Sequence, residues 1–401
     1  ITSQLKAGEY DSITKALNFS RIMTEEIQSV SHDKHMRVII RRQRPKMDPG
    51  SDPLLDQYLR TLKGESENYG FQKVEILEKN IGYVDFRYFA SPVKAADRVV
   101  AVMDFLKYSD AIIYDLRKNG GGNPEMIQLM CSYLFDEKIH LNSLYWREGD
   151  KIVEFWTLNE IEGMRMPAIP VYVLTSDYTF SGAEEFTYNL KTRNRATIIG
   201  ETTGGGANPG GIHPITEHFG MFIPEGRAIN PVTGTNWEGT GVEPDIKVDS
   251  DSALVIAIRE AIPNAEKYRL SKIDKAESLL ADIKSTEIAV DKLIRGGNIN
   301  EATNIFEQAL SNGVNQKLLN EMDINRMGYD YLRKDKIETA IIVFKFNVKS
   351  YPDAYNTFDS LGEAYMKSGD KELAIKNYKK SLELNPQNDN AVKMLNQLKV
   401  N

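Results

Sequence analysis

The chain has 401 residues, enough for two or three domains with well-formed hydrophobic cores. Asp and Glu (57) outnumber Lys and Arg (50), and this acidic balance argues against a nucleic-acid-binding protein. No run of about 18 apolar residues occurs, so we expect no transmembrane segment. The single cysteine, Cys131, excludes an intrachain disulfide framework and a cysteine-based zinc site. We therefore expect a multidomain protein without a metal, and no motif implies a cofactor.

The first of three predicted regions, residues 1–45, is a helical subdomain. Apolar residues such as Ile13 and Leu17 recur at helical spacing within residues 1–30. Residues 41–53 are charged and contain prolines, so a solvated loop is favoured there over a nucleic-acid patch. The chain begins with Ile1 rather than Met, and we expect it to be a processed chain that has lost any signal peptide.

The second region, residues 70–262, is predicted to be mixed α/β. Apolar strand-like runs alternate with helical patterns, at 111–116, 170–174 and 196–199 for strands and at 124–134 and 183–190 for helices. This alternation indicates βαβ units and a largely parallel sheet, with hairpin strands at 151–157 and 218–224. A helix over 252–262 is expected to end at Pro263, where we place the domain boundary.

The third region, residues 273–401, contains an internal repeat. The pairs Gly328/Gly362, Ala340/Ala374, Phe344/Tyr378, Tyr331/Tyr365 and Pro352/Pro386 are all 34 residues apart. This period is typical of tetratricopeptide repeats, in which small residues let two helices pack closely. Ala302 begins an earlier copy, but it precedes Ala340 by 38 residues, which predicts a longer connection there. About three repeats would form a small all-α solenoid with a groove for a protein partner.

Residues 115–122 form the first candidate binding segment, Asp-Leu-Arg-Lys-Asn-Gly-Gly-Gly, after a predicted strand. Glycines at the carboxyl end of a strand let backbone N–H groups approach a ligand, and ligands bind at that edge of open α/β sheets. Alternatively, the same glycines could serve only to form a tight turn between the strand and the helix. Arg117 is expected to make a structural ion pair. The segment lacks the third glycine of a dinucleotide fingerprint, and the chain has no P-loop.

Ser181 lies in the second segment, again between a strand and a helix. At a helix N-terminus, free N–H groups and the helix dipole would stabilise developing negative charge. The N–H of Gly182 would face those of the first segment, so that together they could form an oxyanion hole. Considered alone, Ser181 and Glu184 are better explained as a capping box, unless Thr179 caps the helix and leaves Ser181 free.

Two further turns carry glycines and carboxylates. Residues 200–207 could form a substrate-binding rim, with Gly204, Gly205 and Gly206 as the candidate residues. Residues 235–245 supply carboxylates and end in an extended stretch. Each is an ordinary turn when considered by itself.

Together, the four segments resemble the tail-specific protease superfamily, which includes the C-terminal processing peptidases, the tricorn protease core and the interphotoreceptor retinoid-binding protein. The matching residues are Asp115-Leu116-Arg117-x-Asn119-x-Gly121-Gly122, Phe180-Ser181-Gly182-Ala183-Glu184, Gly200-Glu201-x-Thr203-x-Gly205-Gly206-Ala207 and Gly241-Val242-x-Pro244-Asp245. The resemblance covers roughly residues 1–262. It implies a ClpP/crotonase-like α/β core, serine peptidase activity and a periplasmic or extracytoplasmic location.

Two departures make the chain more similar to the retinoid-binding and tricorn branch. Processing peptidases use a serine/lysine dyad, but the position 25 residues after Ser181 is Gly206. Lys191 is no substitute, because ten residues along a helix turn it about 280° away. Only about 35 residues separate Val38 from the next predicted strand, which is too few for the PDZ insertion of the processing and tricorn enzymes.

The tricorn branch activates its serine with a histidine and a glutamate, which match His35 and Glu238 here. The resemblance implies that His35 is the general base for Ser181 and that Glu238 supports the imidazole, directly or through a further residue. Lys34 stands at the position where tricorn has an additional serine beside its histidine. A cation beside His35 would oppose formation of the imidazolium.

The oxyanion hole implied by the resemblance consists of Gly121, or its neighbour Gly122, together with Gly182. Three functions are compatible with these features. The first is a serine-type peptidase that cleaves peptides or unfolded protein ends and recruits substrate or partners through its repeats. The second is a non-catalytic scaffold that binds an apolar ligand or peptide, and the third is an adaptor that acts through its tetratricopeptide groove. We favour the peptidase.

Overall fold

The computed structural model describes residues 1–41 and 53–400. The charged segment expected to be a loop lies mostly outside the described residues. The chain divides into two units, Ile1–Leu270 and Ser271–Asn401. No described helix has both the length and the apolar character that crossing a bilayer requires.

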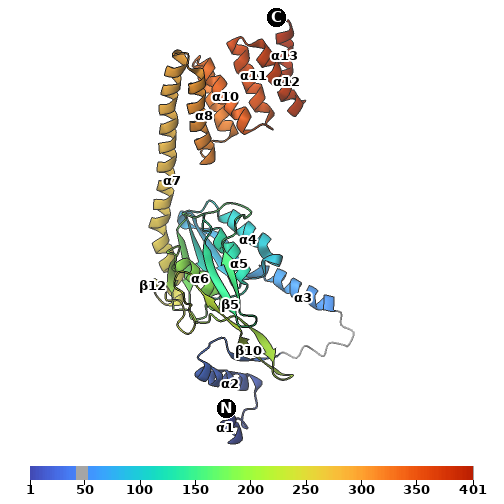
Figure 1. The fold of residues 1–401 in the computed structure, drawn as a ribbon, viewed down its shortest axis with the longest axis vertical. Coiled ribbons are helices and arrows are strands. Elements are labelled where there is room, and N and C mark those ends of the chain that lie inside the picture. The colour runs from blue at the N-terminus through green and yellow to red at the C-terminus, as the bar shows by residue number, and fades with distance from the viewer. Residues whose placement is uncertain (42–52, 401) are drawn as a thin grey trace. The chain divides into compact units, whose positions relative to one another are not determined.

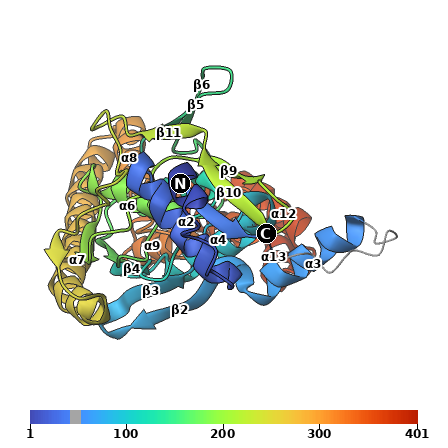
Figure 2. The ribbon, with the colours of Figure 1, turned by 90° about the horizontal axis from the view of Figure 1, so that it is seen from below.

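The first unit begins with helices and a small antiparallel sheet. Its elements are α1 (Thr2–Lys6), α2 (Ala16–Ser31), β1 (Arg37–Ile40), β9 (Gly210–Pro214) and β10 (Phe219–Pro224). β1 pairs with β10, and β10 pairs with β9. α2 lies beside β10 in both views (Figures 1 and 2), and the rings of Phe19 and Phe219 are 5.2 Å apart. The helices predicted for residues 1–30 are confirmed, and β10 joins this N-terminal part to the rest of the unit.

A six-stranded sheet forms the core of the first unit, in the order β12-β8-β7-β4-β3-β2. All neighbouring strands are parallel except β2 and β3, so the largely parallel sheet is confirmed. The strands are β2 (Phe71–Leu77), β3 (Ile81–Phe86), β4 (Ala111–Asp115), β7 (Val171–Thr175), β8 (Thr197–Gly200) and β12 (Ile246–Lys247).

Helices cover both faces of this sheet. Three of them, α4 (Pro92–Leu106), α5 (Pro124–Ser132) and α6 (Gly182–Lys191), share one core with it, and the first part of α7 packs on the other face (Figure 1). Within β4, Tyr114 joins the first core and Ile113 the second. A strand buried on both faces must be apolar throughout, which explains its unbroken hydrophobic run.

α7 (Ser250–Arg295) is one helix of 46 residues, so the prediction that a helix ends at Pro263 is wrong. Pro263 lies on the exposed face, while buried alanines continue past it on the other face, at Ala253, Ala257, Ala261 and Ala265. Proline removes one helix hydrogen bond. Close to it, the carbonyl of Glu260 accepts hydrogen bonds from Tyr172 (3.0 Å) and Asn264 (2.9 Å). Packing against the sheet thus outweighs the local effect of the proline.

A third sheet and short helices complete the first unit. β5 pairs antiparallel with both β6 and β11, which confirms the predicted hairpin. The remaining elements are α3 (Pro53–Ser66), two 3-10 turns at Asn68–Gly70 and Glu78–Asn80, β5 (His140–Trp146), β6 (Lys151–Trp156) and β11 (Gly226–Ile229).

The described part of the second unit is helical and built from helix pairs, as the repeat predicted. Its helices after α7 are α8 (Ile299–Asn315), α9 (Glu321–Arg333), α10 (Ile337–Ser350), α11 (Tyr355–Ser368), α12 (Lys371–Leu384) and α13 (Asp389–Val400). Ala302, Ala340 and Ala374 are each the fourth residue of their helix and fully buried. The repeating alanine therefore marks the same packing position in α8, α10 and α12.

The predicted longer connection is confirmed and accounts for half of the four extra residues. The connections 316–320 and 334–336 are each one residue longer than their counterparts 351–354 and 369–370. The other half is a net change in the helices, because α8 has 17 residues where α10 has 14, whereas α9 has 13 where α11 has 14. The repeated glycines act as predicted: a Cβ on Gly328 would lie 2.4 Å from the ring of Phe344, and one on Gly362 would lie 3.0 Å from Tyr378.

Candidate active site

Ser181 lies at the carboxyl end of the parallel sheet, in the turn between β7 and α6. Its φ of 54° and ψ of −120° are a conformation that residues with a Cβ rarely adopt. The first glycine segment packs directly against this turn. A Cβ on Gly121 would lie 2.6 Å from the nitrogen of Gly182 and 2.9 Å from Cβ of Ser181. Only a glycine at position 121 permits this close approach.

Thr179 does not cap α6, which corrects the alternative considered above. Its Oγ1 donates to the carbonyl of Leu116 at 2.9 Å and accepts from the N–H of Ser176 at 2.9 Å. Ser181 occupies the N-cap position instead, and its N–H donates to Oε2 of Glu184 at 2.8 Å. Thr179 thus ties the turn to the end of β4, while the carboxylate of Glu184 fixes the backbone of Ser181.

The imidazole of His35 lies beside Ser181, with Nε2 3.1 Å from Oγ. His35 precedes β1, so the pairing of β1 with β10 brings it to this edge of the sheet. The ring packs against Phe180 and Phe222, at centroid distances of 4.6 and 5.4 Å. Only 4% of His35 is exposed. The two residues implied by the resemblance are therefore in hydrogen-bonding distance in a largely apolar setting.

Burial is the largest influence on the pKa of His35 and lowers it to about 4. The charge of Asp33 raises this pKa, and that of Arg37 lowers it. Lys34, expected to provide the opposing cation, instead directs its Nζ to the carbonyl of Gly204 at 2.7 Å. His35 is thus neutral near pH 7, which is the form that can accept a proton.

Of the three glycines predicted to form an oxyanion hole, two have free N–H groups. The N–H of Gly121 donates to Oδ1 of Asn119 at 2.9 Å and is not available. No described residue accepts a hydrogen bond from the N–H of Gly122 or Gly182. A Cβ on Gly182 would lie 2.9 Å from the nitrogen of Gly122, so the two segments meet beside Ser181.

Glu184 holds residues 200–207 in place, a role that the sequence did not predict. Its fully buried carboxylate accepts hydrogen bonds from Oγ1 of Thr203 (2.5 Å) and from the N–H groups of Gly205 (2.6 Å) and Gly206 (2.9 Å). Burial raises the pKa of Glu184 to about 7, and these donors counteract the rise. The N–H of Gly204 donates to the turn before α6. The N–H groups of all three predicted rim glycines are therefore engaged within the protein.

Gly206 also leaves room for the histidine. A Cβ at this position would lie 2.6 Å from Cε1 of His35 and 2.2 Å from Cζ of Phe180. Position 206 is where the lysine of a serine/lysine dyad would stand. A side chain at position 206 would clash with His35 in its observed position.

Polar residues of the first glycine segment hold the sheet edge together. Arg117 pairs with Asp115 at 2.6 Å, which confirms the predicted structural ion pair, and donates to the carbonyl of Ser250 at 2.7 Å. Nδ2 of Asn119 donates to the carbonyl of Phe86 at 2.8 Å. These contacts fix the glycines relative to β3 and the start of α7.

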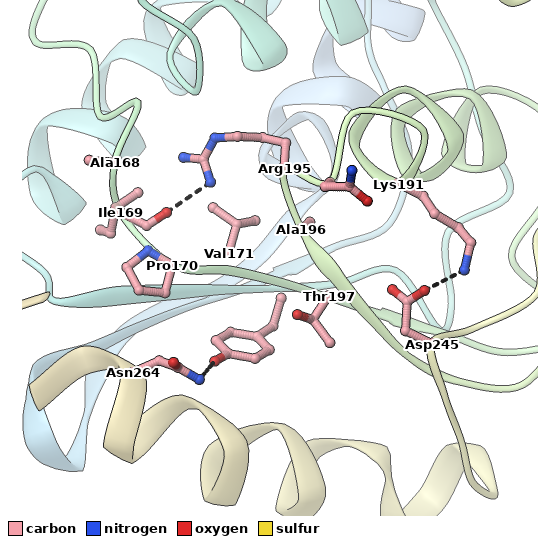
Figure 3. A pocket seen from close by; sticks show the side chains of 12 residues that line it. Ala168, Ile169, Pro170, Val171, Lys191, Arg195, Ala196, Thr197, Asp245 and Asn264 are labelled. Atoms are coloured by element: carbon pink, nitrogen blue, oxygen red, sulfur yellow. Dashed lines mark hydrogen bonds and ion pairs between the residues drawn. The ribbon is translucent and has the colours of Figure 1, made fainter. Parts of the chain in front are cut away.

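A pocket of about 480 Å³ lies at the opposite, amino end of β7 and β8 (Figure 3). Lys191 lines it and pairs with Asp245 at 2.5 Å, so this lysine points away from Ser181 as predicted. Arg195 also lines the pocket and donates to the carbonyl of Ile169 at 2.8 Å. None of the predicted catalytic residues contributes to this pocket.

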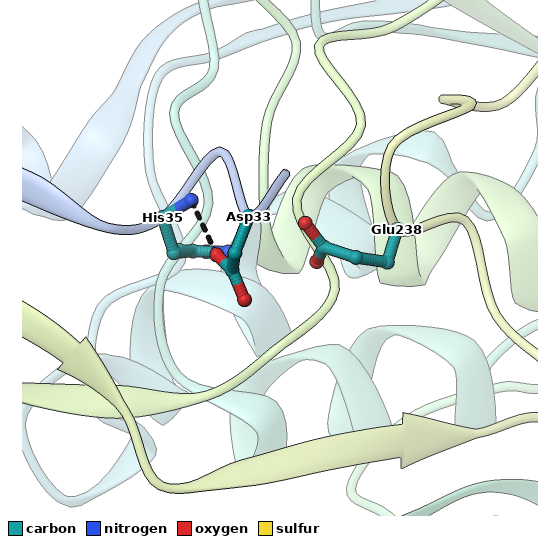
Figure 4. Close-up of side chains that lie close together, drawn as sticks. All are labelled: Asp33, His35 and Glu238. Atoms are coloured by element: carbon teal, nitrogen blue, oxygen red, sulfur yellow. Dashed lines mark hydrogen bonds between the residues drawn. The ribbon is translucent and has the colours of Figure 1, made fainter. Parts of the chain in front are cut away.

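Two carboxylates lie close to His35 (Figure 4). One ring nitrogen of His35 and one carboxylate oxygen each of Asp33 and Glu238 are all within 4.8 Å of one another. Oε2 of Glu238 accepts from the N–H groups of Ala207 (2.6 Å) and Asn208 (3.1 Å). Nδ2 of Asn208 donates to Oδ2 of Asp33 at 2.7 Å. Glu238 makes no direct hydrogen bond to the imidazole, and Asp33, which was not predicted, is a second acidic neighbour.

Comparisons with known proteins agree with this architecture. Residues 80–248 match the model of peptidase family S41, and residues 360–388 match that of the tetratricopeptide repeat. The tricorn protease of Thermoplasma volcanium is 29% identical over 174 residues, which are 40% of this chain and 15% of that protein. A "Probable CtpA-like serine protease" of Staphylococcus aureus is 25% identical over 215 residues, which are 51% of this chain and 38% of that protein. The chain thus spans less than two fifths of the length of either relative.

Solved structures of similar proteins include a photosystem II D1 C-terminal processing protease, with a TM-score of 0.35 and 21% identity over 46% of this chain and 48% of that chain. They also include the tricorn protease, with a TM-score of 0.33 and 18% identity over 53% of this chain and 19% of that chain.

Proposed function

Because residues 80–248 belong to peptidase family S41 and residues 360–388 are a tetratricopeptide repeat, we propose that this chain is a serine peptidase with Ser181 as its nucleophile and His35 as its general base. One observation carries the proposal. Nε2 of a buried, neutral imidazole lies 3.1 Å from the serine hydroxyl, beside backbone N–H groups that have no described acceptor.

In the proposed reaction, Nε2 of His35 accepts the proton of Oγ while Ser181 attacks a peptide carbonyl. The N–H groups of Gly122 and Gly182 donate to the developing oxyanion. Loss of one such donor lowers kcat by about 10²–10³-fold in other serine peptidases. The imidazolium then protonates the leaving amine, and a water molecule hydrolyses the acyl-enzyme.

Asp33 and Glu238 have a supporting role in this proposal. Burial disfavours the imidazolium, as the pKa of about 4 for His35 indicates. The negative charge of Asp33 raises this pKa and so offsets that effect when the proton moves to the ring. Together with Glu238, Asp33 also favours the tautomer with the proton on Nδ1, which leaves the lone pair of Nε2 directed at Ser181.

We propose peptides or unfolded protein ends as substrates, with the tetratricopeptide unit recruiting a protein substrate or partner. Recruitment predicts a lower KM for an unfolded protein than for a short peptide that contains the same cleaved sequence, with a similar kcat. Equal KM values for the two substrates would contradict recruitment and leave the catalytic proposal intact.

The catalytic proposal is tested by hydrolysis of an unfolded protein substrate. Ser181→Ala and His35→Ala should each abolish cleavage. Two matched controls should retain it: Ser91→Ala, at a helix N-cap whose side chain makes no capping hydrogen bond, and His213→Ala, in an exposed pair with Glu225. Cleavage that persists in Ser181→Ala would refute the proposal.

A further inference from the structure

One of the two nitrogens of the buried His35 ring lacks a described hydrogen-bond partner. Nε2 faces Oγ of Ser181, whereas Nδ1 has no hydrogen-bond partner among the residues that the structure describes. The side chain is almost completely buried. Buried polar atoms nearly always have a partner, and one without a partner requires an explanation.

The two carboxylates close to the imidazole of His35 retain acceptor capacity. Among the described residues, Oε1 of Glu238 receives only the N–H of Lys34, at 3.3 Å, and Oδ2 of Asp33 receives only Nδ2 of Asn208. Each of these oxygens has a second lone pair to offer. The hydrogen bonds that are present hold both carboxylates in place, as outer hydrogen bonds do for metal ligands.

Electrostatics at this position favour a cation. One carboxylate oxygen of Asp33 and one of Glu238 lie within 4.8 Å of each other, so the two negative charges repel each other. Lys34 directs its ammonium group to the carbonyl of Gly204. A divalent ion between the carboxylates would relieve the repulsion and at the same time give Nδ1 a partner.

We propose that Asp33, His35 and Glu238 form a binding site for a divalent transition-metal ion such as Zn²⁺, and that the bound ion inhibits Ser181. Zinc binds imidazole nitrogen and carboxylate oxygen at about 2.0–2.2 Å, which places tetrahedral ligand atoms about 3.4 Å apart. One ring nitrogen of His35 and one oxygen of each carboxylate already lie within 4.8 Å of one another, so small side-chain rotations complete the site. Water would supply the fourth ligand.

Inhibition follows from the tautomer of the imidazole. A metal on Nδ1 requires that nitrogen to be deprotonated, so the proton of the neutral ring resides on Nε2. Nε2 would then donate to Oγ of Ser181 instead of accepting its proton, and the serine would lose its base. This consequence rests on the proposed function, whereas binding of the ion does not. No local sequence motif indicates this metal site, because Asp33 and His35 lie about 200 residues before Glu238 in the chain.

Titration calorimetry of the full chain with ZnCl₂ tests binding independently of activity. The Ser181→Ala variant should bind one equivalent, and adding Asp33→Asn or Glu238→Gln should each weaken binding at least about tenfold. Adding His213→Gln, which alters the exposed His213–Glu225 pair, should leave binding unchanged. Absence of binding, or binding that both carboxylate substitutions leave unaffected, would overturn the proposal.

Nitrogen-15 NMR of histidine-labelled Ser181→Ala identifies the ligand atom. The chain has five histidines, and a His35→Gln spectrum assigns the relevant one. Zn²⁺ should shift Nδ1 of His35 strongly and leave Nε2 protonated. A shift confined to Nε2 or to another histidine would refute the site, and this readout holds even if a carboxylate variant fails to fold.

The inhibitory effect is tested separately on the wild-type chain, with a fluorophosphonate probe that reacts with activated serines. Zn²⁺ should suppress labelling of Ser181, and Mg²⁺, which binds imidazole poorly, should not. Labelling unaffected by saturating Zn²⁺ would refute inhibition. If Ser181 is not labelled even without metal, the proposed peptidase function fails, while calorimetry and NMR still decide the metal site.

Discussion

His35 and Ser181 are 146 residues apart in the chain, yet Nε2 of one lies 3.1 Å from Oγ of the other. The contact depends on two separate sheets. Ser181 follows β7 of the parallel sheet, whereas His35 precedes β1, which is held by β10 of the antiparallel sheet. The geometry of the site therefore depends on the turn at Ser181 as well as on the pairing of β1 with β10.

Gly121→Ala should disrupt this turn. Gly121 has a φ of 99°, and its added Cβ would lie 2.6 Å from the nitrogen of Gly182. We expect the free energy of unfolding to fall by at least about 2 kcal/mol and peptidase activity to be lost. Gly149→Ala is the matched control, because its φ is 76° but nothing lies within 4 Å of the new Cβ. Unfolding in denaturant gives the free energy of unfolding of both variants. Equal losses of this free energy would contradict the role assigned to Gly121.

Glu184→Gln should destabilise the chain by about 2–3 kcal/mol at pH 8, where the carboxylate is ionised. Glu184 accepts four hydrogen bonds, from Oγ1 of Thr203 and the N–H groups of Gly205, Gly206 and Ser181. A glutamine side chain would direct an NH₂ group at donors. The measurement is chemical unfolding together with activity, and unchanged values for both would show that this hydrogen-bond network is dispensable.

The adjacent Glu185 should make the stability of the fold depend on pH. Burial raises the pKa of Glu185 from 4.5 to about 8, so the folded chain holds a proton that the unfolded chain releases. Its contribution to stability is therefore complete at low pH and is lost as the pH rises from about 4.5 to about 8. Glu185→Gln cannot ionise and should avoid this loss.

Unfolding of wild type and Glu185→Gln across that pH range tests the assignment. The stability of the variant relative to the wild type should increase steadily from pH 5 to pH 8. A difference that does not change with pH would mean that Glu185 is not a buried protonated carboxyl.

In the second unit, Gly328→Ala should destabilise more than Gly362→Ala. The new Cβ would lie 2.4 Å from the ring of Phe344 in the first case and 3.0 Å from Tyr378 in the second. We expect a loss of about 1–3 kcal/mol for Gly328→Ala and a smaller one for Gly362→Ala. Thermal unfolding checks the order, and the reverse order would contradict the packing described for the two repeats.

Much of the architecture could be predicted because it has a local or periodic signature. Buried strands such as β4 are continuous apolar runs, and the 34-residue repeat reflects one glycine–aromatic contact made twice. α7 was not predicted to continue, because local rules treat Pro263 as a helix end. The alanines that hold the helix on the sheet act through tertiary contacts, which local rules do not include.

The candidate site likewise has features that the sequence predicted and features that it could not predict. The resemblance paired His35 with Ser181, and the geometry brings them together, while their catalytic roles stay a proposal. The occupied N–H of Gly121 and the four hydrogen bonds to Glu184 depend on how distant turns meet, which no single segment encodes. Asp33 lies two residues before His35, and a carboxylate so close to a candidate base was the available signal.

The most direct test of the account is fluorophosphonate labelling of the purified chain, with the adduct located by mass spectrometry. Such probes react with serines that are already activated. We predict labelling at Ser181 in the wild type and none in folded Ser181→Ala and His35→Ala variants. Absence of labelling in a folded wild-type chain, or labelling that persists in His35→Ala, would contradict a serine activated by this histidine.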